Sequence, residues 1–222
     1  MGIKNKKLNL LDIFSIAAGA MISSGIFIIP GLAFKMAGPS ILFSYTLAGV
    51  LAFTGLLSIA ELSSAMPKSG GDYYYITRSL GPMVGTVSGL SSWFALCLKS
   101  SFALIGIAEF GIYFFNFDIR FVAVIFSIIF TVLNIVGAKE AGRTQVGMVA
   151  FVIIFISMFS LTTFKHVNPQ HFIPFASHGI MPMLAAAGYV FVSYGGLLKI
   201  AGMAEEIENP SKNIPLGLLI SL

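Results

Sequence analysis

The sequence predicts an all-helical membrane protein with about six spanning helices and the start of a seventh. Apolar residues make up 57% of the 222 residues and charged residues only 10%, and the mean hydropathy is +0.92. So few polar residues cannot build an ordinary water-exposed surface. The apolar residues also gather into long runs, as helices that cross a lipid bilayer require.

Six apolar runs are long enough to cross a bilayer core, which takes about 20 residues at 1.5 Å per residue. They are residues 10–34, 41–65, 83–115, 121–136, 146–164 and 180–204. The fourth run is short for a span, and the third is long enough to tilt strongly. Another run begins at Pro215 and reaches Leu222, so we expect the chain to end inside a seventh helix.

Basic residues in the connections predict a cytoplasmic N-terminus, because eight fall in the inner segments of that arrangement and three in the outer ones. The inner residues are Lys4, Lys6, Lys7, Lys68, Arg78, Lys139, Arg143 and Lys212, and the outer ones are Lys35, Arg120 and Lys165. The connections are short, so residues 1–222 are expected to form a single transmembrane domain.

Two local patterns predict how the helices begin and pack. The inner loop 66–82 contains three consecutive tyrosines, which suit the membrane interface, and we expect a short surface helix there. Gly81, Gly85 and Gly89 follow at four-residue spacing. Small residues at this spacing let helices approach closely in lipid, so we expect this face to pack against another span.

Several functional classes are excluded by composition and spacing. The basic residues are scattered between apolar runs, which does not favour nucleic-acid binding. Cys97 is the single cysteine, and His166, His171 and His178 match no common metal spacing. No nucleophile and base pair or carboxylate dyad indicates an enzyme. We therefore expect no catalysis, metal or cofactor.

Two of the six runs are interrupted by residues that weaken a helix. Gly19–Gly25 reads Gly-Ala-Met-Ile-Ser-Ser-Gly in the first run, and Ser193–Gly196 reads Ser-Tyr-Gly-Gly in the sixth. Each interruption alone is also explained by close helix packing. Two interrupted helices at corresponding positions of a repeated unit, however, indicate a substrate site near the bilayer midplane.

The motifs around these interruptions resemble the amino acid permeases of the amino acid–polyamine–organocation superfamily. The motifs are Gly19-Ala-Met-Ile-Ser-Ser-Gly-Ile-Phe27, Pro67-Lys-Ser-Gly-Gly-Asp-Tyr-Tyr-Tyr75, and Tyr194-Gly-Gly followed by Glu205-Glu-Ile-Glu-Asn-Pro-Ser-Lys-Asn-Ile-Pro215. The resemblance covers essentially the whole chain and implies the leucine-transporter fold, an inverted repeat of five helices with the first and sixth helices unwound. Residues 1–164 would then form the first repeat and residues 165–222 an incomplete second one.

The resemblance also implies secondary active transport of amino acids across the plasma membrane by alternating access. A buried zwitterion needs partners for both charges. Free N–H groups at the start of a new half-helix can bind its α-carboxylate, and by aligned position the carbonyls ending the first half of the sixth helix accept from its α-ammonium. The expected binding residues are Ala20, Met21, Ser23, Ser24, Gly25, Phe191, Val192, Ser193, Tyr194 and Gly195.

Lys99 lies near the middle of the third run, where an unpartnered charge costs about 2.5 to 3.5 kcal/mol on insertion scales. It is a candidate for coupling, as a replacement for a cation or a proton-linked group, or for contact with an acidic substrate. Pairing with a carboxylate or snorkelling to the interface is the structural alternative. In some family members a fifth-helix lysine stands where others bind sodium, and this sequence has Val152 near that position.

Other readings stay open on the sequence alone. The coupled species is a proton, sodium or an exchanged substrate, and the substrate is an amino acid, a polyamine or another organocation. A truncated, non-transporting half-subunit or scaffold that needs another chain is the alternative function. Glu205, Glu206 and Glu208 form a solvated inner collar or pair with Arg78 and Arg143 as a gating network.

Overall fold

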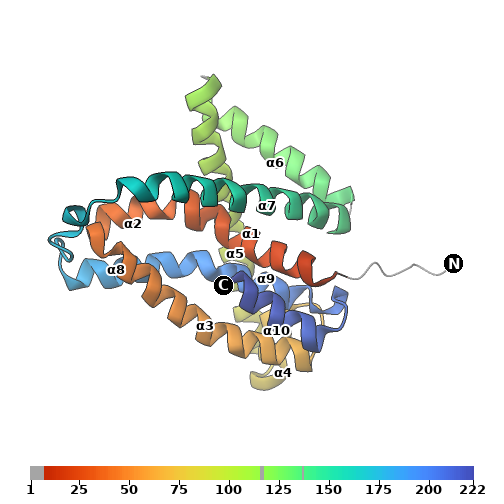
Figure 1. Ribbon diagram of the computed structural model, residues 1–222. Coiled ribbons are helices and arrows are strands. Elements are labelled where there is room, and N and C mark those ends of the chain that lie inside the picture. Colours follow the sequence, from red (N-terminus) through yellow and green to blue (C-terminus); the bar gives the residue numbers. More distant parts are fainter. Residues whose placement is uncertain (1–7, 116–117, 137) are drawn as a thin grey trace.

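The computed structural model describes the backbone of residues 8–115, 118–136 and 138–222 and is helical over most of that length (Figure 1). The α-helices are α1 (Leu10–Phe27), α2 (Ile29–Ala37), α3 (Ile41–Ala65), α4 (Gly71–Leu80), α5 (Pro82–Phe115), α6 (Ile119–Val136), α7 (Ala138–Thr163), α8 (Ile180–Phe191), α9 (Leu197–Gly202) and α10 (Pro210–Ser221). Short 3-10 turns are η1 (Gly38–Ser40), η2 (Phe164–His166), η3 (Pro169–Phe172), η4 (Val192–Gly196) and η5 (Ala204–Glu206). The short helix expected within residues 66–82 is confirmed as α4, and its location at the inner membrane surface stays a prediction.

Four helical stretches in the described residues are long and apolar enough to cross a membrane, namely Ile29–Ala65, Pro82–Glu109, Thr144–His166 and Ile180–Gly202. The first and fourth expected spans correspond to two shorter apolar helices, Leu10–Ile22 and Ile119–Leu133. The helices therefore support a multi-pass membrane protein with four candidate spans, where we expected six. The last helix, α10, begins five residues before the expected start, with Pro215 inside it.

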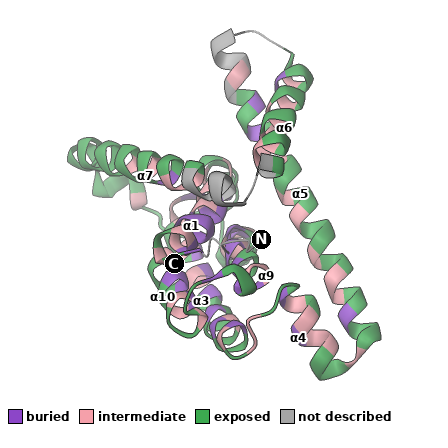
Figure 2. Ribbon diagram, turned by 90° about the vertical axis from the view of Figure 1, so that its right-hand side faces the viewer, coloured by how far each residue is buried: buried purple, intermediate pink, exposed green. Residues whose placement is uncertain are grey.

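The core lies where α1 packs against α3, α9 and α10. Ile13, Leu56, Ile200, Ile214 and Leu218 are fully buried there and belong to one apolar cluster. Burial is concentrated in these helices, whereas most of α5, α6 and α7 is exposed (Figure 2). Because lipid is as apolar as these side chains, an exposed apolar helix face is expected for a spanning segment.

The start of α1 is held by two local contacts. Asn9 and Asp12 each accept a hydrogen bond from the other's backbone N–H at 3.0 Å, which caps the helix N-terminus. Leu8 forms a parallel β-bridge with Ile207, in which the Leu8 N–H donates to the Glu206 carbonyl at 2.8 Å. The segment before α1 is thereby joined to the segment after α9.

The glycine face of α5 packs against α4, not against another span as we expected. A Cβ atom at Gly89 would lie 2.8 Å from Cδ2 of Tyr73, and one at Gly85 would overlap the hydroxyl of Thr77. Nothing lies within 4 Å of a Cβ built at Gly81. Gly85 and Gly89 therefore allow α4 to fold back onto α5.

Candidate functional site

The two interrupted segments lie against each other. A Cβ atom built on Gly25 would stand 2.9 Å from the Cβ of Ser193, and one built on Gly196 would stand 2.7 Å from the carbonyl oxygen of Ala17. Contacts this short need glycine at both positions. The glycines of α1 and η4 therefore allow the two backbones to approach more closely than side chains would permit.

The structure does not show the unwinding that we expected at Gly19–Gly25. That stretch belongs to the continuous helix α1, and the first interruption follows at Ile28, after which α2 begins with Pro30 in its first turn. At the end of α1, the hydroxyl of Tyr45 donates to the Gly25 carbonyl at 2.9 Å. This bond satisfies one of the carbonyls that a helix end leaves without an intrahelical partner.

The sixth-run interruption coincides with a change of helix type. The backbone tightens into the 3-10 turn η4 between α8 and α9, and Ser193 is buried there. Its hydroxyl donates to the carbonyl of Val190 at 2.6 Å. A hydroxyl that bonds back to its own helix competes with the regular hydrogen-bond ladder, which fits a local distortion at this residue.

The expected binding residues fall into two groups. Ala20, Met21 and Gly25 are buried on α1, and the side chains of Ser23 and Ser24 lie outside the described residues. Phe191, Val192, Tyr194 and Gly195 line a second region, a cavity of about 490 Å³ between α3, α5 and η4. Gly25 and Ser193 provide the direct contact between the two groups.

Lys99 joins α5 to the second group. Its Nζ donates to the Ser193 carbonyl at 3.1 Å and, at a longer 3.5 Å, to the Val192 carbonyl. Both carbonyls belong to the end of the first half of the sixth helix, where we expect the carbonyls of about Phe191, Val192 and Ser193 to bind the substrate's α-ammonium. In this structure the two carbonyls accept from an ammonium group, which is the chemistry that such binding requires.

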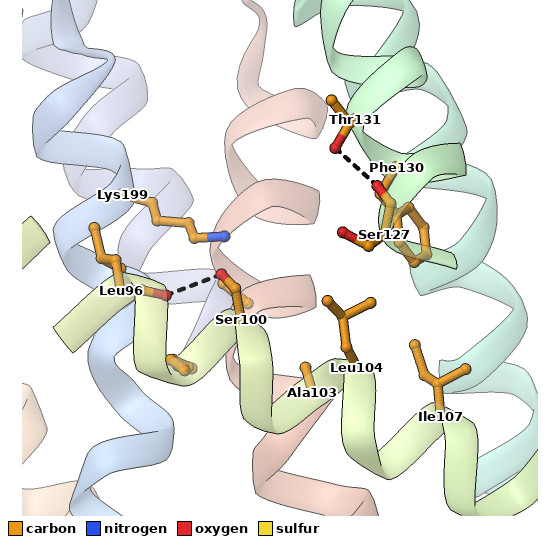
Figure 3. A pocket seen from close by; sticks show the side chains of 11 residues that line it. Leu96, Ser100, Ala103, Leu104, Ile107, Ser127, Phe130, Thr131 and Lys199 are labelled. Atoms are coloured by element: carbon orange, nitrogen blue, oxygen red, sulfur yellow. Dashed lines mark hydrogen bonds between the residues drawn. The ribbon is translucent and has the colours of Figure 1, made fainter. Parts of the chain in front are cut away.

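A larger cavity of about 620 Å³ lies beside α1, between α5, α6 and α9. Its lining includes Ala20, Lys99 and Lys199, and Figure 3 shows Lys199 extending from α9 toward the polar faces of α5 and α6. The hydroxyls of Ser100 and Thr131 donate to the carbonyls of Leu96 and Ser127, respectively, one helical turn earlier. The cavity thus combines apolar walls with two cations.

Three polar residues at the site were not predicted. Tyr45 carries no sequence signal beyond its place in an apolar run. Gln145 donates from Nε2 to the Ser15 carbonyl at 3.3 Å and would meet any side chain at Gly19. Lys199 stands out as a basic residue within an apolar run, and that signal could have identified it as a lining residue.

A separate polar contact joins η5 to the loop before α4. Glu205 accepts hydrogen bonds from the backbone N–H of Ser69, at 3.3 Å, and from its hydroxyl. These bonds and the nearby charge of Lys68 lower the pKa of the Glu205 carboxyl. Among the described residues, Glu205 therefore contacts a loop serine and not Arg78, while the side chain of Arg143 lies outside those residues.

The named relatives of this chain are permeases and transporters. The family model described as "Amino acid permease" matches residues 8–222. A branched-chain amino acid permease and a methylthioribose transporter of Bacillus subtilis are 27% and 28% identical, each over 98% of this chain and 51% of the relative. A chloroplastic cationic amino acid transporter of Arabidopsis thaliana is 30% identical over 96% of this chain and 41% of its own length. The chain spans about half the length of the curated relatives it matches.

Proposed function

Because the chain belongs to the amino acid permease family, we propose that it binds an amino acid between α1 and η4 during secondary active transport. Transport is across the plasma membrane by alternating access, with the N-terminus in the cytoplasm. The fold is of the leucine-transporter type, with residues 1–164 as the first repeat and residues 165–222 as part of the second. The role is transport and not catalysis.

The close approach of Gly25 to Ser193 carries this proposal. It brings together the two segments that supply opposite partners for a zwitterion. The N–H groups around Ser23, Ser24 and Gly25 bind the α-carboxylate when α1 opens, and the carbonyls of η4 bind the α-ammonium. The hydrogen bonds from Lys99 to the carbonyls of Val192 and Ser193 support the proposed ammonium binding, because these carbonyls already accept from an ammonium group.

Replacing Gly25 by leucine tests the site. The side chain would enter the space of Ser193, so we expect uptake to be abolished while membrane insertion is retained. Gly31→Leu is the matched control, because nothing lies within 4 Å of a Cβ at that position and the residue is outside the proposed site. Undiminished uptake by the Gly25 variant would contradict the proposed site.

The measurement is uptake of labelled amino acids into proteoliposomes, with ligand-induced thermal stabilisation as a second readout. Stabilisation without uptake would favour the binding-only half-subunit or scaffold. Stabilisation by putrescine but by no amino acid would favour the polyamine alternative. Imposed proton and sodium gradients, and preloading with substrate, distinguish proton coupling, sodium coupling and exchange.

A further inference from the structure

We propose that the cavity between α5, α6 and α9 selects amino acids with an acidic side chain, whose carboxylate is held by Lys99 and Lys199. The inference rests on the proposed amino acid transport and names its substrate class. It follows from the charge of the cavity, from the hydrogen-bond donors left free in it, and from its continuity with the proposed zwitterion site.

Lys99 and Lys199 are the charged residues among the described lining of the cavity. Lys99 and Lys199 belong to different spans, and both line the same space of about 620 Å³. The other described lining residues are apolar or carry hydroxyls, and none is a carboxylate. Cations at membrane depth are costly unless they face a cavity and meet an opposite charge, and a bound anion would supply that charge.

The free donors of the cavity favour an anion. Lys99 has three N–H groups and, among the described residues, donates to two carbonyls of η4, so a donor is left for a ligand. Within the described part of the chain, Lys199 and the Ser127 hydroxyl have no hydrogen bond or ion pair. Ser100 and Thr131 already donate to backbone carbonyls, so their hydroxyls offer acceptors only. Two ammonium groups and one hydroxyl therefore remain to hold a carboxylate.

Lys99 connects this cavity to the proposed zwitterion site. Its ammonium bonds the Ser193 carbonyl on one side, and it lines both the cavity beside η4 and the larger cavity beside α6. A carbonyl oxygen has two lone pairs, so Ser193 can accept from Lys99 and from the substrate ammonium together. A substrate held at η4 would then place an acidic side chain within the larger cavity, toward Lys199.

Charge complementarity predicts the order of preference. An acidic amino acid has one net negative charge and offsets part of the positive charge of the cavity. A neutral one leaves that charge unchanged, and a basic one adds a third cation. Like charges brought together away from water are strongly disfavoured. We therefore expect glutamate to bind more tightly than leucine, and leucine more tightly than arginine.

The test compares L-glutamate, L-leucine, L-arginine and glutarate, a dicarboxylate without an ammonium group, by thermal stabilisation and by uptake into proteoliposomes. In Lys199→Met we expect glutamate affinity to fall roughly tenfold or more, because one partner of a charge pair is lost. Leucine affinity should change little in that variant, and Lys199→Arg should retain glutamate binding. Lys165→Met, at an exposed lysine of η2, is the control and should behave as the unmodified protein.

Each outcome has a separate meaning. Leucine transport with no preference for glutamate would overturn this inference and leave amino acid transport standing. Equal binding of glutarate and glutamate would overturn it in favour of a dicarboxylate site. Binding of no amino acid at all would remove both this inference and the proposed function. The order of affinities in the unmodified protein tests the proposal even where a lysine variant fails to fold.

Discussion

Tyr45 reaches from α3 to the end of α1, where its hydroxyl bonds the Gly25 carbonyl at 2.9 Å. Tyr45→Phe removes the bond and keeps the ring. We expect a loss of about 0.6 kcal/mol in stability, the average for interhelical hydrogen bonds measured in a membrane protein. Thermal unfolding in detergent measures the change. An unchanged midpoint would show that this bond contributes nothing to the packing of α1 on α3.

For Tyr75 we expect replacement by phenylalanine to have the opposite effect on stability from Tyr45→Phe. It is buried in α4, and its hydroxyl has no hydrogen-bond partner among the described residues. A buried hydroxyl without a partner carries an uncompensated desolvation cost. We expect Tyr75→Phe to leave stability unchanged or raise it by about 1 kcal/mol. The same thermal assay checks this, and marked destabilisation would reveal a partner for the hydroxyl.

The contact between Glu205 and Ser69 is expected to depend on pH. Its pKa is lowered first by the hydrogen bonds from Ser69 and then by Lys68. A lowered folded-state pKa means that the contact stabilises the fold above the ordinary pKa of the carboxyl and is lost as pH falls through the folded value. Thermal midpoints measured from neutral to acidic pH should therefore show a component that Glu205→Gln removes. Glu206→Gln is the control, and equal profiles for Glu205→Gln and the unmodified protein would contradict the role of this contact.

At the scale of elements, α4 and α5 depend on the glycines between them. A Cβ at Gly85 would lie 2.8 Å from Cα of Thr77, which a rotamer change cannot relieve. We expect Gly85→Ala to cost about 1 to 3 kcal/mol, as overpacking usually does. Gly147→Ala in α7 meets nothing within 4 Å and should instead gain up to about 1 kcal/mol of helix propensity. Unfolding of both variants in detergent measures the difference, and equal effects would contradict the packing of α4 on α5.

The helix breaks show how far a local pattern predicts local structure. Glycine in a helix costs about 1 kcal/mol relative to alanine. In lipid no water is available to replace broken backbone hydrogen bonds, so a helix can stay intact despite this cost. The glycines of Gly19–Gly25 therefore permit a break without forcing one, and α1 continues to Phe27. At Ser193 the same kind of pattern coincides with a real change of geometry, supported by the hydroxyl bond to Val190. The glycine and serine patterns pointed to both segments, Gly19–Gly25 and Ser193–Gly196. They could not show that only the second one departs from α-helical geometry.

Long-range pairing was the least predictable part of the site. The apolar runs indicated the helices, and the lysine within the third run indicated a polar neighbour for Lys99. The identity of that neighbour, the Ser193 carbonyl, depends on how α5 crosses η4. The contact of Tyr45 with Gly25 likewise depends on the packing of α3 against α1. Hydropathy cannot predict such crossings, because apolar residues face both the core and the lipid.

At the scale of the whole molecule, stability comes from the bundle around α1, while α5, α6 and α7 expose most of their apolar residues (Figure 2). Transfer from lipid to an apolar protein core brings little hydrophobic gain, so close packing must supply the stabilisation. Two neighbouring leucines of α3 lie in different environments, one in the packed core and one on the exposed face. Leu56 is fully buried in the core cluster, whereas Leu57 is 51% exposed.

These two leucines test where the core lies. Leu56→Ala leaves a cavity among α1, α3 and α9 and should cost about 2 to 5 kcal/mol. Leu57→Ala removes the same atoms from an exposed face, where lipid or detergent fills the space, so its cost should be well below that of Leu56→Ala. Thermal unfolding in detergent compares the two, with insertion measured alongside because both variants lose the same hydrophobicity. A larger loss for Leu57→Ala would mean that α3 turns its other face to the core, and would place Leu57, not Leu56, against α1.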